Sequence, residues 1–222
     1  MYASDLHLQL FITLTVTTIL LILLFTKNRS AKWIIGVTLI VSQTLATIHN
    51  IRINPHQVLW LCNITATLGI ILLFTFRQRL FDLFVFFSWA GDILTLLIPD
   101  SVTLPPVDTY PVFWISYWLK HISPLVLTVY FFYREHRKIS HQAITFVIGI
   151  MFTYTALIYV WDVIFDQNIM DLIEPTLDLE RAFGSWPIYV FVDILIALVW
   201  FGAIYMLAGR LGFVARVEHK NR

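Results

Sequence analysis

The chain has 222 residues, of which 59% are hydrophobic and only 13% are charged, and its mean hydropathy is +0.77. Soluble domains are closer to half apolar and a quarter charged, so this composition excludes a soluble enzyme. The net charge of +1 and the pI of about 7.9 argue against a nucleic-acid partner, because such binders carry a strong excess of basic residues.

The apolar residues occur in seven blocks, most of them near the ~20 residues that a helix needs to cross a bilayer. Lipid offers backbone groups no hydrogen-bond partners, so each block is predicted to be a helix. We therefore expect an all-α polytopic membrane protein, a single domain over residues 1–222. Its seven transmembrane helices are predicted at residues 9–26, 33–48, 57–76, 80–98, 111–133, 142–165 and 186–209.

The basic residues alternate between the two sides of the predicted bundle. Twelve of the 15 Lys and Arg residues follow spans one, three, five and seven: Lys27, Arg29, Lys32, Arg77, Arg79, Arg134, Arg137, Lys138, Arg210, Arg216, Lys220 and Arg222. Short cytoplasmic loops are rich in Lys and Arg. The amino terminus is therefore predicted outside the membrane and the carboxyl terminus in the cytoplasm.

Five ionisable side chains fall at depth within the predicted spans: Asp92, Lys120, His121, Asp162 and Asp193. Such groups are costly in lipid and usually face the bundle interior, where they pair or function. Counted from the outer helix ends at about 1.5 Å per residue, the acids and His121 lie in the outer half of the membrane, as Cys62 and Asn63 do. This shared depth predicts a buried polar chamber that opens to the outer leaflet.

Several of these polar residues also have a structural interpretation. Lys120 is expected to form an ion pair with Asp92 or Asp193. Thr155, Tyr159 and Asp162 share one face of the sixth span and are predicted to point into the bundle. Asp82, three residues from Arg79, is predicted to be a solvated residue at the inner helix end.

Cys62 and His121 form a candidate catalytic pair. The reactive form of a cysteine is the thiolate, which a neighbouring histidine favours, and attack on a lipid ester would give an acyl thioester. Asn63 is a candidate donor to the developing oxyanion. The alternative is that Cys62 is a small buried apolar residue, as most free cysteines are.

Neither a metal nor a cofactor is predicted. Cys62 is the single cysteine, which excludes an intrachain disulfide and a cysteine-rich metal cluster. The histidines are scattered, and no two share a helix turn within a span. Glycine-rich motifs for nucleotide phosphates are absent from the sequence.

Short motifs follow one another from the third span onward: LCNITA at residues 61–66, LTLLIPD at 94–100, KH at 120–121, DQN at 166–168, and SWPIY at 185–189 with Asp193 downstream. In this order they resemble the YwaF-like family of small bacterial integral membrane proteins. That family is similar to a eukaryotic multi-span protein that transfers fatty acyl chains between glycerophospholipids.

The resemblance implies a multi-pass protein of the bacterial plasma membrane, with Cys62 as nucleophile, His121 as general base, and Asn63 and Asp193 at the same site. Two positions depart from the family pattern. Trp60 stands where a histidine is common, and Lys120 stands where a small or polar residue is common. The first removes a second imidazole, and the second adds a cation beside the proposed base.

Two classes of function follow. The first is a phospholipid acyltransferase or acyl hydrolase that uses Cys62 and His121, with membrane lipids as partners. Its substrate-binding or supporting residues would be Asn63, Asp92, Lys120, Tyr159, Asp162, Asn168 and Asp193. The alternative is a non-enzymatic transporter or binding protein for a small molecule, an ion or a lipid, in which Asp92, Asp162 and Asp193 act. The sequence identifies no protein partner.

Overall fold

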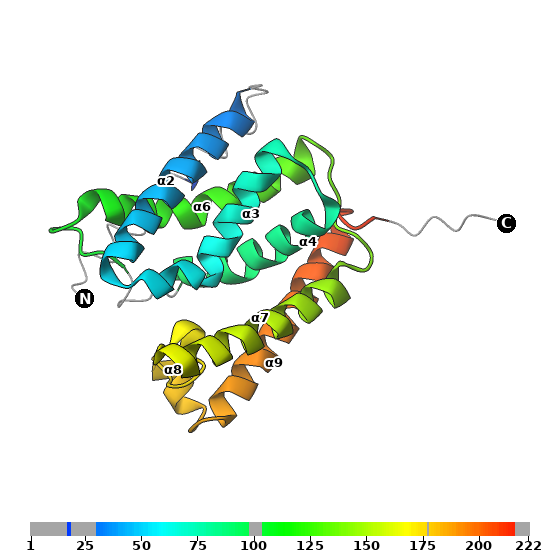
Figure 1. Cartoon of the computed structure of the whole chain (residues 1–222). Helices are drawn as coiled ribbons and strands as arrows, with labels where there is room; N and C mark the ends of the chain where they lie inside the picture. The colour runs from blue at the N-terminus through cyan, green and yellow to red at the C-terminus, as the bar shows by residue number, and fades with distance from the viewer. Residues whose placement is uncertain (1–16, 19–29, 98–103, 177, 216–222) are drawn as a thin grey trace.

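A computed structural model describes residues 17–18, 30–97, 104–176 and 178–215 (Figure 1). Within these residues, five helices are long and apolar enough to cross a membrane: α2 (Ala31–Ile53), the composite helix Gln78–Leu97, α6 (Pro111–Tyr133), α7 (Ala143–Phe165) and α9 (Ile188–Arg210). The prediction of an all-helical membrane protein is therefore confirmed. The first predicted span, residues 9–26, lies outside the described residues except for helical residues 17 and 18.

The third predicted span, residues 57–76, is wrong at both ends. Pro55 begins a short 3₁₀ turn, η1 (Pro55–Leu59), which the side chain of Asn54 caps by accepting a hydrogen bond from the His56 N–H. Trp60 is extended, with φ −62° and ψ 143°, so α3 (Leu61–Phe74) begins after it and has 14 residues. The break places Cys62 in the first turn of a helix.

The second predicted span, residues 33–48, is too short, because α2 runs from Ala31 to Ile53. The polar side chains that lower its hydropathy find partners within the helix. Ser42 donates to the Leu39 carbonyl at 3.1 Å, and Gln43 donates to the Thr47 hydroxyl at 3.1 Å. The fifth agrees at both ends and the sixth differs by one residue at its start, while the fourth and seventh differ by one or two residues at each end.

The composite helix contains a π-helical turn. Its parts are α4 (Gln78–Phe87), the π turn η2 (Ser88–Asp92) and α5 (Ile93–Leu97). A π turn has a wider hydrogen-bond spacing than the α-helix around it, and such turns are frequent at functional sites. Asp92 is its last residue, so the direction of this carboxylate depends on the π turn.

The helices form two groups. α2, α3, α4 and α6 pack together around a core that includes Leu39, Phe84 and Phe131. Gly69 allows α3 to approach its neighbours, because a Cβ there would come within 2.8 Å of the Phe84 ring and 2.9 Å of Leu39. α7 and α9 run side by side as a second group, which contacts the first through α4 and η2 (Figure 1).

The two groups differ in how much of their surface they bury. In the most apolar window of each helix, 67% of the residues of α6 are buried, against 17% for α7 and 11% for α9. α6 is therefore the central helix, and α7 and α9 present most of their side chains to the surroundings.

The segments that follow predicted spans three, five and seven meet at one end of the molecule, together with the start of α2. Lys32 pairs with Glu135 at 2.7 Å, and the Ile139 N–H donates to the Phe213 carbonyl at 2.8 Å. The basic residues in these segments are therefore gathered at one end, as their alternation along the sequence requires. That this end is cytoplasmic stays a prediction.

Asp82 lies at this end but is not solvated as expected. Its side chain is buried, and Oδ1 accepts hydrogen bonds from the Ser140 N–H at 2.9 Å and from Gln78 Nε2 at 2.8 Å. Oδ2 accepts a third from the Ser140 hydroxyl at 2.7 Å. The carboxylate therefore fixes the connection between α6 and α7 to the start of α4.

Replacing Asp82 with Ala is expected to lower the free energy of unfolding by about 1–3 kcal/mol, because it removes a buried carboxylate that accepts three hydrogen bonds. Denaturation in detergent micelles, followed by circular dichroism, measures the change. Asp108→Ala, at an exposed position, is the control and should change the free energy by less than about 0.5 kcal/mol. Equal effects in the two variants would contradict the structural role of Asp82.

Candidate functional site

A cavity of about 490 Å³ lies between the two helix groups. Five of the residues selected from the sequence line it: Cys62, Lys120, His121, Asn168 and Asp193. Its volume is within the ~300–1,000 Å³ of typical small-molecule sites. The rest of its wall is largely apolar and includes Leu61, Phe87, Leu94, Phe113, Ile196 and Trp200. We call it the main cavity. It brings five of the selected residues together, but its wall is largely apolar and not the polar chamber that was expected, and its opening toward the outer leaflet stays a prediction.

Cys62 is the second residue of α3 and is partly exposed to the main cavity. Lys120 reaches it from α6, with Nζ 3.3 Å from Cys62 Sγ and 3.2 Å from Asn63 Oδ1. A neighbouring cation and a helix N-terminus both favour a thiolate over a thiol. Cys62 therefore lies at a cavity wall beside a cation and not in an apolar core.

The expected ion pair of Lys120 with Asp92 or Asp193 does not form within the described residues. Asp92 is instead occupied by His121, and Lys120 turns toward Cys62 and Asn63. The physical reason is helical geometry, since adjacent residues on a helix point about 100° apart. Lys120 and His121 consequently meet different helices.

Asn63 holds Lys120 in place. Its Nδ2 donates to the Gln57 carbonyl at 2.8 Å, and its Oδ1 accepts from Lys120 and, at 3.3 Å, from Gln43 Nε2. One of the two N–H groups of this amide is used in the bond to Gln57, and Asn63 is not among the residues that line the main cavity. Its role as an oxyanion donor stays a prediction. Gln43 was missed by sequence reasoning, although a Gln within an apolar span is the kind of signal that marks such a residue.

His121 and Asp92 form a buried pair, each with 1% of its side chain exposed. His121 Nδ1 lies 2.7 Å from Asp92 Oδ1, and within the described part of the chain His121 Nε2 has no hydrogen-bond partner. Donation from Nδ1 to the carboxylate leaves Nε2 as the acceptor in a neutral imidazole. An oriented histidine of this kind can accept or donate a proton at Nε2.

No hydrogen bond joins Cys62 to His121 in the ranges that the structure describes. The two side chains line the same cavity from α3 and α6, but the group in contact with the sulfur is Lys120. The cation that appears as a departure from the YwaF-like pattern is thus the immediate neighbour of the proposed nucleophile.

The residues selected from the loop after α7 and from its end have supporting positions. Asn168 Oδ1 accepts hydrogen bonds from the backbone N–H groups of Ile173 and Glu174, at 3.0 and 3.1 Å, and so shapes the rim of the main cavity. Asp162 is buried outside the cavity lining, and its Oδ2 accepts from the Ile169 N–H at 3.0 Å. It fixes the loop to the end of α7.

The expectation that Thr155, Tyr159 and Asp162 all point into the bundle is wrong for Tyr159. Tyr159 is 38% exposed, and it does not line the main cavity. The reason is that α7 packs along a narrow stripe, so one common helical face is not buried along its whole length. Asp193, by contrast, lies at the main cavity as expected.

The fold and this site define a class: a multi-span helical membrane protein in which a partly exposed Cys, a buried Lys and a buried Asp–His pair lie at a largely apolar cavity. The chain belongs to the TMEM164 family, whose model matches residues 2–205 and so includes every residue of the site. No curated protein and no solved structure matches the chain.

Proposed function

We propose that the protein transfers or hydrolyses fatty acyl groups of membrane phospholipids through a thioester on Cys62. The observation that carries the proposal is the contact between Lys120 Nζ and Cys62 Sγ at the first turn of α3. This nucleophile faces a cavity that is apolar enough for lipid and also contains His121. The resemblance to the YwaF-like family, and through it to a phospholipid acyltransferase, supports the same reaction.

In the first step the thiolate attacks the ester carbonyl carbon of the lipid. The carbon–oxygen bond to glycerol breaks, the acyl group moves to Sγ, and the proton that the thiol released goes to the leaving oxygen. In the first turn of α3 the Asn63 N–H donates to the Trp60 carbonyl at 2.9 Å, so the N–H groups of Leu61 and Cys62 are the proposed donors for the oxyanion. Lys120 offsets the negative charge of the sulfur.

In the second step a hydroxyl group, from a lysophospholipid or from water, attacks the thioester. The carbon–sulfur bond breaks, the acyl group leaves on the new oxygen, and the proton of the acceptor returns to the sulfur. His121 Nε2 carries the proton in each step, and Asp92 holds the ring in the orientation that allows it.

We further infer an orientation with the amino terminus outside a bacterial plasma membrane. The described basic segments gather at one end, and the loops that form the rim of the main cavity lie at the other. With the basic end in the cytoplasm, the cavity opens toward the outer leaflet. The esters of that leaflet are then the substrates within reach of Cys62.

The transport alternative has less support from the geometry. Of its three acids, Asp92 pairs with His121, Asp162 bonds to the loop backbone, and only Asp193 lines the main cavity. Normal transport of a substrate with all three changed to Asn would refute this alternative.

Acyl exchange between a labelled phospholipid and an unlabelled lysophospholipid in vesicles tests the proposed reaction. Cys62→Ser is expected to abolish exchange, and His121→Ala to lower it by about 10²–10⁴-fold, the usual contribution of a general acid–base group. Tyr159→Phe, on the exposed face of α7, is the control and should leave the rate unchanged. Retained exchange in both Cys62→Ser and His121→Ala would remove the mechanism.

A further inference from the structure

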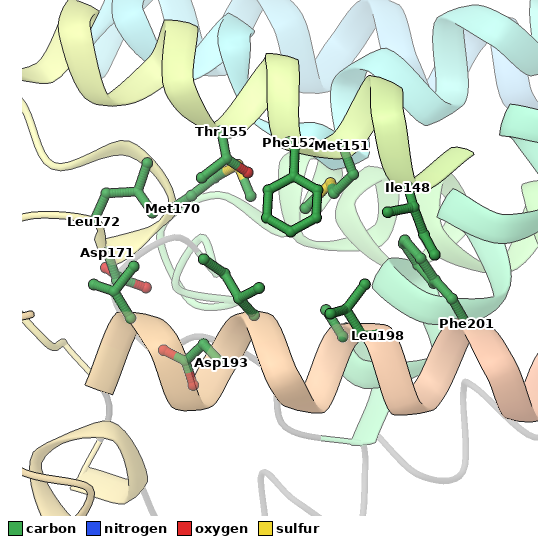
Figure 2. Close-up of a pocket in the computed structure, with 13 residues that line it drawn as sticks. Ile148, Met151, Phe152, Thr155, Met170, Asp171, Leu172, Asp193, Leu198 and Phe201 are labelled. Atoms are coloured by element: carbon green, nitrogen blue, oxygen red, sulfur yellow. The ribbon is translucent and has the colours of Figure 1, made fainter. Parts of the chain in front are cut away.

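A second cavity, of about 190 Å³, lies between α7 and α9. Figure 2 shows Met151 and Phe152 of α7 opposite Leu198 and Phe201 of α9, with the cavity between them. We call it the α7–α9 pocket. It adjoins the main cavity, because six residues line both: Met151, Met170, Asp171, Asp193, Ala197 and Phe201.

The lining of the α7–α9 pocket changes in character along its length. Its polar groups, Thr155, Asp171 and Asp193, lie toward the loop that follows α7, and Ile148 and Phe201 lie at the other end (Figure 2). Asp193 and Phe201 are eight residues apart on α9, which corresponds to about 12 Å along the helix. The pocket is therefore an elongated, largely apolar space that runs alongside the main cavity, since Asp193, Ala197 and Phe201 line both.

The two helices that form this pocket are also the two with the most exposed surfaces. In a membrane those surfaces face lipid, since a helix crossing the hydrocarbon core has no water beside it. The α7–α9 pocket therefore lies between two lipid-facing helices and adjoins the cavity that contains Cys62. A hydrocarbon chain is the narrow, apolar group that fits such a space.

We propose that the α7–α9 pocket holds a fatty acyl chain of the phospholipid whose ester lies at Cys62. This inference rests on the proposed function and adds to it a selection for chain length. A chain that fills the pocket gains apolar contacts down to Ile148 and Phe201, whereas a short chain ends beside Asp193. Long-chain esters should therefore be preferred substrates, and the far end of the pocket should set the limit.

Ala197 is the position at which to block the pocket, because it is small and lies where the two cavities meet. Ala197→Phe fills this junction, and Ala156→Phe on α7 is a matched control that adds the same ring at an exposed position outside both cavities. Leu198→Trp, which narrows only the α7–α9 pocket, is the second blocking variant. Circular dichroism in micelles checks that each variant is folded.

The probe is a phosphatidylcholine that carries a diazirine and an alkyne at the end of one palmitoyl chain, used in vesicles with the Cys62→Ala background so that no reaction is needed. We expect photocrosslinks in the α7 and α9 segments that line the pocket, reduced about tenfold by Ala197→Phe or Leu198→Trp and unchanged by Ala156→Phe. Crosslinks that persist in both blocking variants, or that lie mainly on the exposed face of α2, would contradict the proposal that the α7–α9 pocket binds an acyl chain.

The same variants on the wild-type background separate this inference from the proposed function. With Cys62 present, Leu198→Trp should lower acylation by a palmitoyl lipid and leave acylation by an octanoyl lipid intact. If Leu198→Trp is acylated equally by both lipids and Cys62 is still modified, the acyl-chain role of the pocket is contradicted but the proposed reaction is not. Pocket crosslinks without any acylation of Cys62 contradict the proposed reaction and leave the pocket as a lipid-binding site.

Discussion

Lys120→Met is expected to slow the alkylation of Cys62 at neutral pH by about 10- to 100-fold. The ammonium lies 3.3 Å from the sulfur, and hydrogen bonds to charged groups are worth roughly 1.5–3 kcal/mol. Methionine keeps the length of the side chain but removes the positive charge beside the sulfur. The rate is measured with iodoacetamide in micelles, by the mass of the modified protein over time.

Two further variants sharpen this comparison. Lys138→Met removes a cation from the exposed basic end and should leave the alkylation rate unchanged. Asn63→Ala removes the amide that holds Lys120, and its effect should be smaller than that of Lys120→Met, because the cation is displaced but not lost. An alkylation rate in Lys120→Met equal to that of the wild type would show that the contact does not activate Cys62.

Asp92→Leu is expected to lower the free energy of unfolding by about 1–3 kcal/mol, the usual cost of leaving a buried hydrogen-bonding group without its partner. His121 would keep its buried position but lose its partner at Nδ1. The double variant Asp92→Leu/His121→Phe should recover much of that stability, because an apolar pair of similar size replaces both groups. Thermal unfolding in micelles measures both.

Activity separates a catalytic pair from a structural one. If His121 carries the proton, the double variant should be stable and still lack acyl exchange. A double variant that is both stable and active would show that Asp92 and His121 only support the helix contact. In that event Lys120 and Cys62 would have to react without a histidine.

Hydropathy predicted the long helices well, because a membrane imposes one length on each of them. Residues 111–133 were predicted to the residue. The start of α3 was not predictable in the same way, since Pro55 and the extended Trp60 interrupt a segment that is apolar throughout. This local break matters for the site, because it moves Cys62 from the interior of a span to a helix start.

The depth of residues was also readable from the sequence. Cys62, His121 and Asp193 were placed at similar depths by counting along rigid helices, and the structure brings all three to one cavity. The partners of each side chain were not readable, because they depend on helix rotation. The adjacent residues Lys120 and His121 point in different directions, and the π turn at Ser88–Asp92 sets the direction of Asp92.

The most direct measurement is labelling of the purified protein in lipid vesicles with a phospholipid that carries an alkyne-tagged acyl chain. Wild type is expected to acquire a tagged acyl group that hydroxylamine removes, as it cleaves a thioester, and Cys62→Ala is expected to acquire none. If the wild type acquires no hydroxylamine-sensitive label, or if Cys62→Ala is labelled to the same extent, Cys62 is not an acyl-carrying nucleophile.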